Sequence, residues 1–244
     1  MLAEPRQAYL LLGLEPELDC WDGNLALRAL QGAEFVVSLS AYRTEAMDSY
    51  AHVLLPLALF AETSGTYINN EGRRQSFTGA SAPPGEARPG WKILRVLGNM
   101  AGVPGFEYNT STDVQTEVEG LLAGLTADNT AAWKFPDRIT RNGAGLQRSS
   151  LVPMNAIDPV TRRAQALQQT MDAADGAVHL NAELAATLGL APGQPALVSQ
   201  DEYATSLPVV VDERVPPGSV LIHAAHPCHA RLGPWYGAVK VSKA

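Results

Sequence analysis

The feature that most constrains the fold is an apolar run, a helical segment and a second apolar run near the start of the chain. Residues 9–12 form a short apolar run, residues 24–30 have the apolar spacing of an amphipathic helix, and residues 35–39 have the pattern of a buried strand. Because a helix between two strands allows them to pair in parallel, this order predicts a β-α-β unit. The loops at 13–16 and 40–44 would then lie at the carboxyl ends of the strands, where open α/β sheets bind ligands.

Patterns further along the chain divide it into three parts. Val53–Pro56 resembles another short buried strand, and residues 91–100 have a helical pattern that Gly102 and Pro104 would end. The predicted parts are an α/β domain at 1–104, a connector with local helix at 105–175 and a small, mostly β domain at 176–244.

The connector and the last part carry further local signals. In the connector, residues 112–122 predict a helix with Ser111 or Thr112 as its N-cap, and Asp113 is placed favourably for the dipole of that helix. In the last part, a strand ending at Leu180 precedes a predicted helix at 181–188. Further strands are predicted around Leu197, at 207–211 and at 219–223, the last after the turn Pro216-Pro217-Gly218.

Charge, cysteine content and hydropathy exclude several classes of function. The formal net charge of −7 opposes attraction to nucleic acid or to anionic lipid. The two cysteines, Cys20 and Cys228, lie far apart, so they predict neither a disulfide framework nor an iron–sulfur ligand set. The longest apolar run, at 53–61, contains Pro56 and is too short to span a bilayer. We therefore expect no nucleic-acid partner and no direct membrane insertion.

The segment Glu62–Gln75 combines residue types that suit an anion site. It holds glycines at 65 and 72, asparagines at 69 and 70, and arginines at 73 and 74. Glycine permits a positive φ and a close backbone approach, and arginine can receive a phosphate or a carboxylate. The alternative is that Glu62 or Glu71 pairs with an arginine and that the loop only braces the fold.

The same segment carries the resemblance to a known family. Residues 50–56, followed by Glu62–Gln75, closely resemble the motif that the molybdopterin oxidoreductase superfamily places in its third domain, although His52 stands where the family usually has aspartate. Residues 85–98 and 158–170 resemble segments of the G subunit of proton-pumping NADH:quinone oxidoreductase, respiratory complex I. Residues 176–244 resemble the dinucleotide-binding double-psi β-barrel that ends this superfamily. The resemblance implies an α/β Rossmann-like domain followed by a mostly β double-psi barrel.

The resemblance also implies what the chain lacks. In the family, cysteine-rich N-terminal domains hold the iron–sulfur clusters and a central domain presents the metal ligand. This chain resembles only the domains that come after those parts, so we expect no catalytic residue, no redox centre and no molybdopterin dinucleotide in it. Loops that line the cofactor pocket in other members would remain as a vestigial pocket, formed by Gly13, Glu15, Asn69, Gly72 and Arg73.

The implied parent transfers electrons from NADH through iron–sulfur clusters to quinone. We expect this portion to be a scaffold that contacts the cluster-bearing N-terminal part of the same subunit and other peripheral-arm subunits, on the cytoplasmic side of the bacterial inner membrane. Two alternatives remain open. One is the C-terminal part of a molybdopterin-dependent enzyme such as a formate dehydrogenase, with an occupied pocket, and the other is a freestanding nucleotide-binding protein.

Residues 223–229 contain a second possible site. His223, His226, Cys228 and His229 offer imidazole and thiol groups, which suit zinc. Their spacing is not the usual paired one, so the alternative is a set of surface histidines in a loop of the barrel. The prediction of no metal rests on that alternative.

Overall fold

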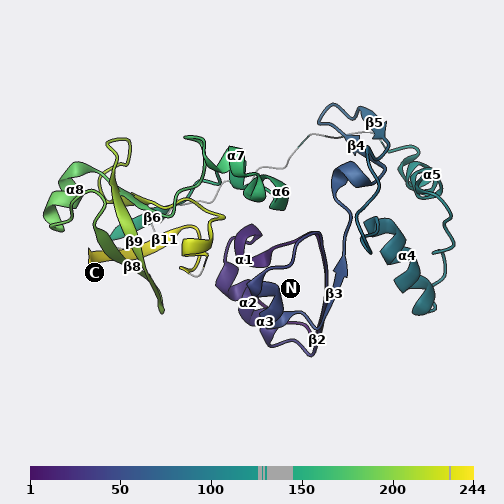
Figure 1. The fold of residues 1–244 in the computed structure, drawn as a ribbon, viewed down its shortest axis with the longest axis horizontal. Coiled ribbons are helices and arrows are strands. Elements are labelled where there is room, and N and C mark those ends of the chain that lie inside the picture. The colour runs from purple at the N-terminus through teal and green to yellow at the C-terminus, as the bar shows by residue number, and fades with distance from the viewer. Residues whose placement is uncertain (126–127, 129, 131–144, 231) are drawn as a thin grey trace.

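The computed structural model describes residues 1–125, 128, 130, 145–230 and 232–244, and for His229 it describes the backbone only. The chain forms a barrel at one end, a small parallel sheet in the middle and a hairpin with two helices at the other end (Figure 1). Residues 131–144 of the predicted connector lie outside the described residues. No helix in the described ranges is both long enough and apolar enough to cross a membrane.

The middle of the molecule is the predicted β-α-β unit. Strands β1 (Ala8–Leu12), β2 (Phe35–Ser40) and β3 (Val53–Pro56) pair in parallel in the order β1-β2-β3. Helices α1 (Pro16–Asp19) and α2 (Gly23–Gln31) connect β1 to β2, and Asp22 caps α2 by accepting from Leu25 N at 2.9 Å. A short helix that was not predicted, α3 (Glu45–Tyr50), connects β2 to β3. Buried side chains such as Leu30, Val36 and Met47 form the core of this unit.

The predicted anion loop is a β-hairpin followed by two helices. Strands β4 (Gly65–Ile68) and β5 (Arg74–Phe77) pair antiparallel, and helices α4 (Gly90–Met100) and α5 (Ser111–Leu122) follow. We call residues 65–122 the hairpin–helix region. The N-cap of α5 is Thr110 rather than Ser111 or Thr112, because Thr110 and Asp113 each accept a hydrogen bond from the other's backbone nitrogen.

Short helical segments lie before and after this region in the chain. They are the single 3₁₀ turns Phe60–Glu62 and Met154–Ala156 and helices α6 (Pro159–Arg163) and α7 (Gln165–Gln168). Helix α6 begins at Pro159 because the Asp158 carboxylate accepts hydrogen bonds from Val160 N at 2.8 Å and Thr161 N at 3.0 Å. This cap directs Arg162 and Arg163, in the last turn of α6, toward the α/β unit.

The last part is a closed barrel with the strand order β10-β6-β11-β8-β9-β7. Its elements are β6 (Leu146–Ser149), β7 (Val178–Leu180), α8 (Ala182–Thr187), β8 (Pro195–Gln200), β9 (Tyr203–Val211), β10 (Ser219–Leu221), a 3₁₀ turn (Pro227–His229) and β11 (Gly237–Lys243). Strand β6 pairs with β10 and β11, so the barrel begins inside the segment predicted to be connector. Fully buried side chains, including Leu180, Leu207 and Ile222, fill its interior.

Candidate functional site

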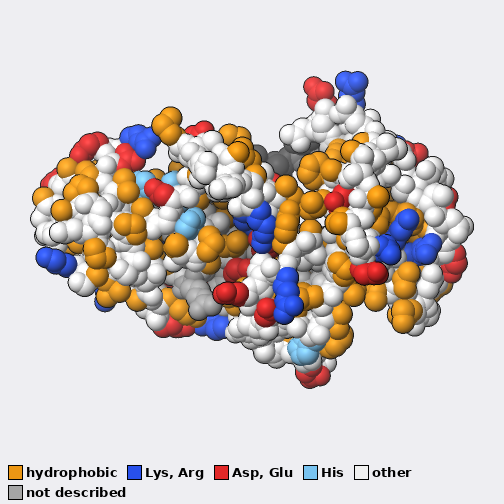
Figure 2. All heavy atoms as spheres, in the orientation of Figure 1, with side chains coloured by type: hydrophobic (Ala, Val, Ile, Leu, Met, Phe, Trp, Pro, Cys, Tyr) orange, Lys and Arg blue, Asp and Glu red, His pale blue; other side chains and the backbone are white. Residues whose placement is uncertain are grey.

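A cleft of about 1170 Å³ lies where the α/β unit, helix α6 and the barrel meet. The α/β unit contributes residues of α1, α2 and α3, the connector contributes Arg162 and Arg163, and the barrel contributes Tyr203 and the turn at 225–227. Figure 2 shows acidic and basic side chains gathered in the middle of the molecule, between the barrel and the parallel sheet. The cleft therefore lies beyond the carboxyl end of β1, on the side where ligands of α/β sheets bind.

A network of buried ion pairs closes one wall of this cleft. Arg162 Nη1 lies 2.9 Å from Glu15 Oε2, and Arg163 Nη2 lies 2.7 Å from Glu15 Oε1. Arg162 also pairs with Asp19. The Glu15 side chain is only 1% exposed and that of Arg162 only 9%, so both charges are buried and depend on each other.

The two arginines are held from several sides. Arg162 Nε donates to the carbonyl oxygen of Ala156 at 2.9 Å, and Arg163 Nη1 donates to that of Pro159 at 3.0 Å. The guanidinium of Arg163 also lies over the ring of Tyr42, 4.2 Å from its centroid, which is a cation–π contact. Their positions are therefore fixed by the protein itself.

Two backbone donors of the loop at residues 13–16 are engaged within the protein. Gly13 has a φ of +63°, which glycine adopts readily, and its nitrogen donates to Leu39 O at 2.8 Å. Glu15 N donates to Asp19 Oδ2 at 2.7 Å. These two amides are already engaged, so an anion at the end of β1 could use them only by displacing their acceptors.

The remaining charges of the cleft are mostly acidic. Burial, and then the nearby Glu15 and Asp19, raise the pKa of Glu17 above its usual value. Arg28, the third arginine in the cleft wall, pairs with Glu202 at 2.7 Å. Among the described residues, the three arginines that line the cleft thus each have a carboxylate partner, which leaves little unpaired positive charge on them for a phosphate.

The structure separates the predicted pocket residues into two groups. Gly13 and Glu15 belong to the loop beside the cleft, whereas Asn69, Gly72 and Arg73 form the turn of the β4–β5 hairpin at the far side of the molecule (Figure 1). In that turn Asn69 Oδ1 accepts from Glu71 N at 3.1 Å and Arg73 N at 2.9 Å, and Gly72 has a φ of +77°. Among the described residues, the ion pair of this hairpin joins Arg74 to Glu119 at 4.0 Å rather than to Glu62 or Glu71.

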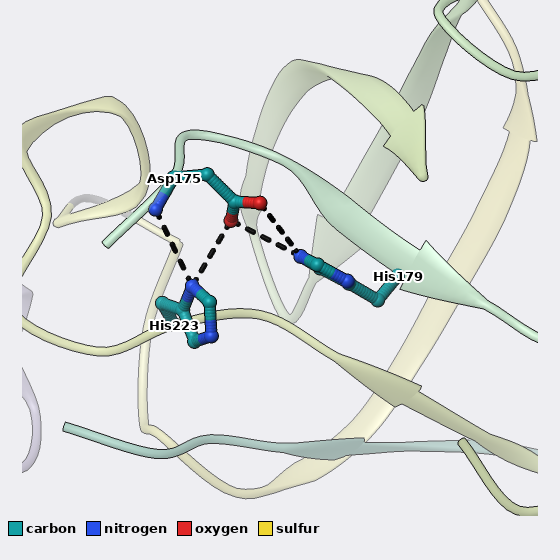
Figure 3. Close-up of side chains that lie close together, drawn as sticks. All are labelled: Asp175, His179 and His223. Atoms are coloured by element: carbon teal, nitrogen blue, oxygen red, sulfur yellow. Dashed lines mark hydrogen bonds and ion pairs between the residues drawn. The ribbon is translucent and has the colours of Figure 1, made fainter. Parts of the chain in front are cut away.

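The predicted zinc candidates are also regrouped. His226 Nδ1 accepts from the backbone nitrogen of Cys228 at 3.2 Å, and the Cys228 side chain is exposed. His223 instead lies beside Asp175 and His179 (Figure 3). The sequence analysis did not identify Asp175 and His179 as ligands. Their spacing, an aspartate and a histidine four positions apart at the start of a predicted strand, could have indicated a metal site.

Comparison with known proteins gives the family of the first part. Residues 1–100 match the family model described as molybdopterin oxidoreductase, so they form a molybdopterin oxidoreductase family domain. The acetylene hydratase of Pelobacter acetylenicus has the same fold over 98% of this chain and 44% of its own, with a TM-score of 0.66 and 15% sequence identity.

Three curated relatives match shorter segments. A nitrate reductase of Synechocystis is 33% identical over 48% of this chain and 17% of its own length, and the F420-dependent formate dehydrogenase subunit alpha of Methanocaldococcus jannaschii is 34% identical over 44% and 16%. The mitochondrial NADH-ubiquinone oxidoreductase 78 kDa subunit of Candida albicans is 53% identical over 20% of this chain and 7% of its own. The chain therefore matches less than a fifth of the length of each of these proteins.

Proposed function

We propose that this chain, whose residues 1–100 form a molybdopterin oxidoreductase family domain, is the C-terminal scaffold portion of an NADH:quinone oxidoreductase subunit of respiratory complex I. The 53% identity to the Candida albicans complex I subunit supports this assignment over the aligned segment. In this proposal the parent passes electrons from NADH through iron–sulfur clusters to quinone, and this segment carries no redox centre. It packs against the cluster-bearing part of the same subunit and neighbouring peripheral-arm subunits, at the cytoplasmic side of the bacterial inner membrane.

The observation that carries the proposal is the ion-pair network in the cleft. A molybdopterin dinucleotide brings a pyrophosphate, which needs free cationic groups or backbone amides. Here Arg162 and Arg163 are paired with Glu15, Arg28 with Glu202, and the amides of Gly13 and Glu15 have acceptors within the protein. This arrangement of the described residues supports a chain without the dinucleotide, because binding it at the end of β1 would first require breaking the buried ion pairs of Glu15.

Elemental analysis of the purified full-length parent tests the absence of the cofactor. We expect iron and acid-labile sulfide from the clusters, and neither molybdenum nor tungsten above trace amounts. A stoichiometric amount of either metal would overturn the proposal.

Deletion of the barrel tests the scaffold role. The cut belongs before residue 145 rather than 176, because β6 at Leu146–Ser149 is a barrel strand and would otherwise lose its partners. We expect a parent that lacks residues 145–244 to fail to join the assembled complex on native gels. Normal assembly and normal NADH:quinone activity of this deletion would contradict a scaffold role.

A second candidate is a molybdopterin-dependent enzyme related to formate dehydrogenases. The volume of the cleft favours it, because about 1170 Å³ would hold a large organic ligand. Titration of the chain with GDP separates the candidates, since an occupied pocket requires affinity for a guanine nucleotide. Saturable binding that is lost in Arg163→Ala would favour the enzyme or a freestanding nucleotide-binding protein, and absence of binding favours the scaffold.

A further inference from the structure

Three metal-ligating side chains meet at the edge of the barrel, apart from the cleft ion pairs. Asp175 precedes β7, His179 lies in β7 and His223 follows β10, and their ligand atoms all lie within 4.8 Å of one another (Figure 3). We propose that Asp175, His179 and His223 bind one divalent transition-metal ion, with Zn²⁺ the best match to this ligand set.

Strand pairing explains why these residues meet. Strands β7 and β10 are antiparallel and place Leu221 opposite His179. His223, two residues beyond Leu221, therefore lies beside the chain that leads into β7, where Asp175 is found. The cluster is thus anchored by a strand pair, because His179 lies in β7 and the other two ligands lie within three residues of the ends of β7 and β10.

The donor atoms already have nearly the spacing that a metal requires. His179 Nε2 lies 3.1 and 2.9 Å from the two oxygens of Asp175, and His223 Nδ1 lies 3.0 Å from Asp175 Oδ1. In a tetrahedral zinc site with bonds of about 2.0–2.1 Å, neighbouring ligand atoms are about 3.3 Å apart. Only a small outward movement of each side chain would admit the ion.

The far side of His179 provides a second reason. Its Nδ1 is buried and has no hydrogen-bond partner among the described residues, yet it faces Asp212 Oδ2 at 3.8 Å. Asp212 is held in place by Arg214, whose Nε and Nη2 donate to it at 2.9 and 2.8 Å. A histidine that binds metal through one nitrogen usually directs the other N–H to a carboxylate, so Asp212 has the position of that supporting group.

The ligand types indicate which metal would bind, and their exposure indicates whether water would complete its coordination. Two imidazoles and one carboxylate suit zinc and related transition metals, whereas Ca²⁺ and Mg²⁺ prefer oxygen ligands alone. The Asp175 side chain is 43% exposed and that of His223 19%, so solvent reaches the cluster from one side. The three protein ligands would therefore leave one coordination position to water.

Metal titration of the 244-residue chain tests the proposal. Competition between the chain and a chromophoric zinc chelator should show one Zn²⁺ per chain. Asp175→Asn, His179→Gln and His223→Gln should each weaken binding by about 100-fold or more, and Asp212→Asn by about 10–100-fold. His52→Gln is the matched control, because His52 lies in the α/β unit beside Val36, and it should bind as the unaltered chain does.

Two further measurements keep the result decisive. Far-UV circular dichroism without metal shows whether each variant is folded, and Co²⁺ in place of Zn²⁺ should give a visible spectrum without a thiolate charge-transfer band. The double variant His226→Gln/Cys228→Ser should keep its affinity. Absence of stoichiometric binding, equal binding by folded Asp175→Asn, His179→Gln and His223→Gln, or loss of binding only in the double variant would overturn the proposal.

Discussion

The barrel and the hairpin–helix region use their apolar residues in opposite ways. The barrel closes its sheet and buries side chains such as Leu207 and Ile222 to 1% exposure or less. In residues 65–122, Ala87 is the one hydrophobic side chain that is buried, while Met100 is 81% exposed and Leu121 73%. Figure 2 shows hydrophobic side chains on the surface at this end of the molecule.

The barrel thus completes a hydrophobic core of its own, whereas the hairpin–helix region does not. A groove of about 280 Å³ between the hairpin and α5 is lined by apolar residues such as Ile68, Trp91 and Val118. The hairpin–helix region therefore leaves apolar side chains on the surface, a feature that is common at contact sites. The barrel, in contrast, buries its apolar side chains in a core of its own.

The largest expected difference between the two ends is in their ion pairs. Arg162→Ala, next to the barrel, leaves Glu15 buried without one of its partners and should lower the free energy of unfolding by about 3–5 kcal/mol. Arg74→Ala, in the hairpin, breaks a solvent-exposed pair with Glu119 and should cost about 1 kcal/mol or less. Urea unfolding followed by circular dichroism measures the free energy of unfolding of both variants. Equal losses would contradict the expected difference between the two ends.

Core truncation should give the next largest difference. Leu207→Ala removes a side chain that is 1% exposed and should destabilise the chain by about 2–5 kcal/mol through lost burial and a cavity. Leu121→Ala, at 73% exposure, should change stability by no more than about 0.5 kcal/mol. A large loss from Leu121→Ala in the same urea experiment would mean that α5 has a core contact after all.

Two glycines test how tightly the hairpin–helix region packs internally. A Cβ on Gly98 would lie 2.4 Å from the ring of Phe106, so Gly98→Ala should destabilise by about 1–3 kcal/mol despite the better helix propensity of alanine. Gly120→Ala, in α5, has nothing within 4 Å and should stabilise by about 0.5–1 kcal/mol. Thermal midpoints of the two variants should therefore move in opposite directions.

The smallest expected effect is on the acid dependence of stability. Burial alone would raise the pKa of Asp175, but hydrogen bonds from His179 and His223 outweigh it and hold that pKa well below its usual value. A lowered pKa contributes stability that is complete above about pH 4 and is lost as the pH falls through that value toward the folded pKa. Asp175→Asn should therefore make the thermal midpoint depend less on pH between about pH 5 and about pH 2.

Asp113 in α5 is the control for this measurement. Its backbone hydrogen bonds from Thr110 and Asn109 also lower its pKa, but the group is fully exposed. Asp113→Asn should flatten the curve less than Asp175→Asn does. A larger flattening by Asp113→Asn than by Asp175→Asn would show that the stability of the barrel edge is not the more sensitive to acid.

Local apolar patterns predicted the parallel sheet well, because its strands are buried on a regular period. Residues 9–12, 35–39 and 53–56 agree with β1, β2 and β3 to within one residue at each end. Helix α3 was missed because only Met47 and Tyr50 of its six residues are buried, which gives no repeat to read. Strand β6 was missed because its sequence, Leu-Gln-Arg-Ser, is polar, although Arg148 is buried in the barrel.

The sites were harder to predict because their residues meet through tertiary contacts. Glu15 pairs with Arg162, which lies 147 positions away in the sequence, and no local sequence pattern predicts that pairing. His223 was identified as a ligand type from its neighbours in sequence, but its partners Asp175 and His179 come from the β7–β10 pairing. The hairpin at 65–77 has mostly exposed strands, so alternation could not reveal it.

The position of β6 has a consequence for the order in which the chain can fold. The β1-β2-β3 unit is complete by Pro56, so it can form from nearby residues early in synthesis. The barrel cannot close until β11 at Gly237–Lys243 inserts between β6 and β8, because the partners of β6 among the described strands are β10 and β11. Until β11 has been synthesised, β6 lacks this partner and keeps an open edge, where a strand of another chain could pair with it.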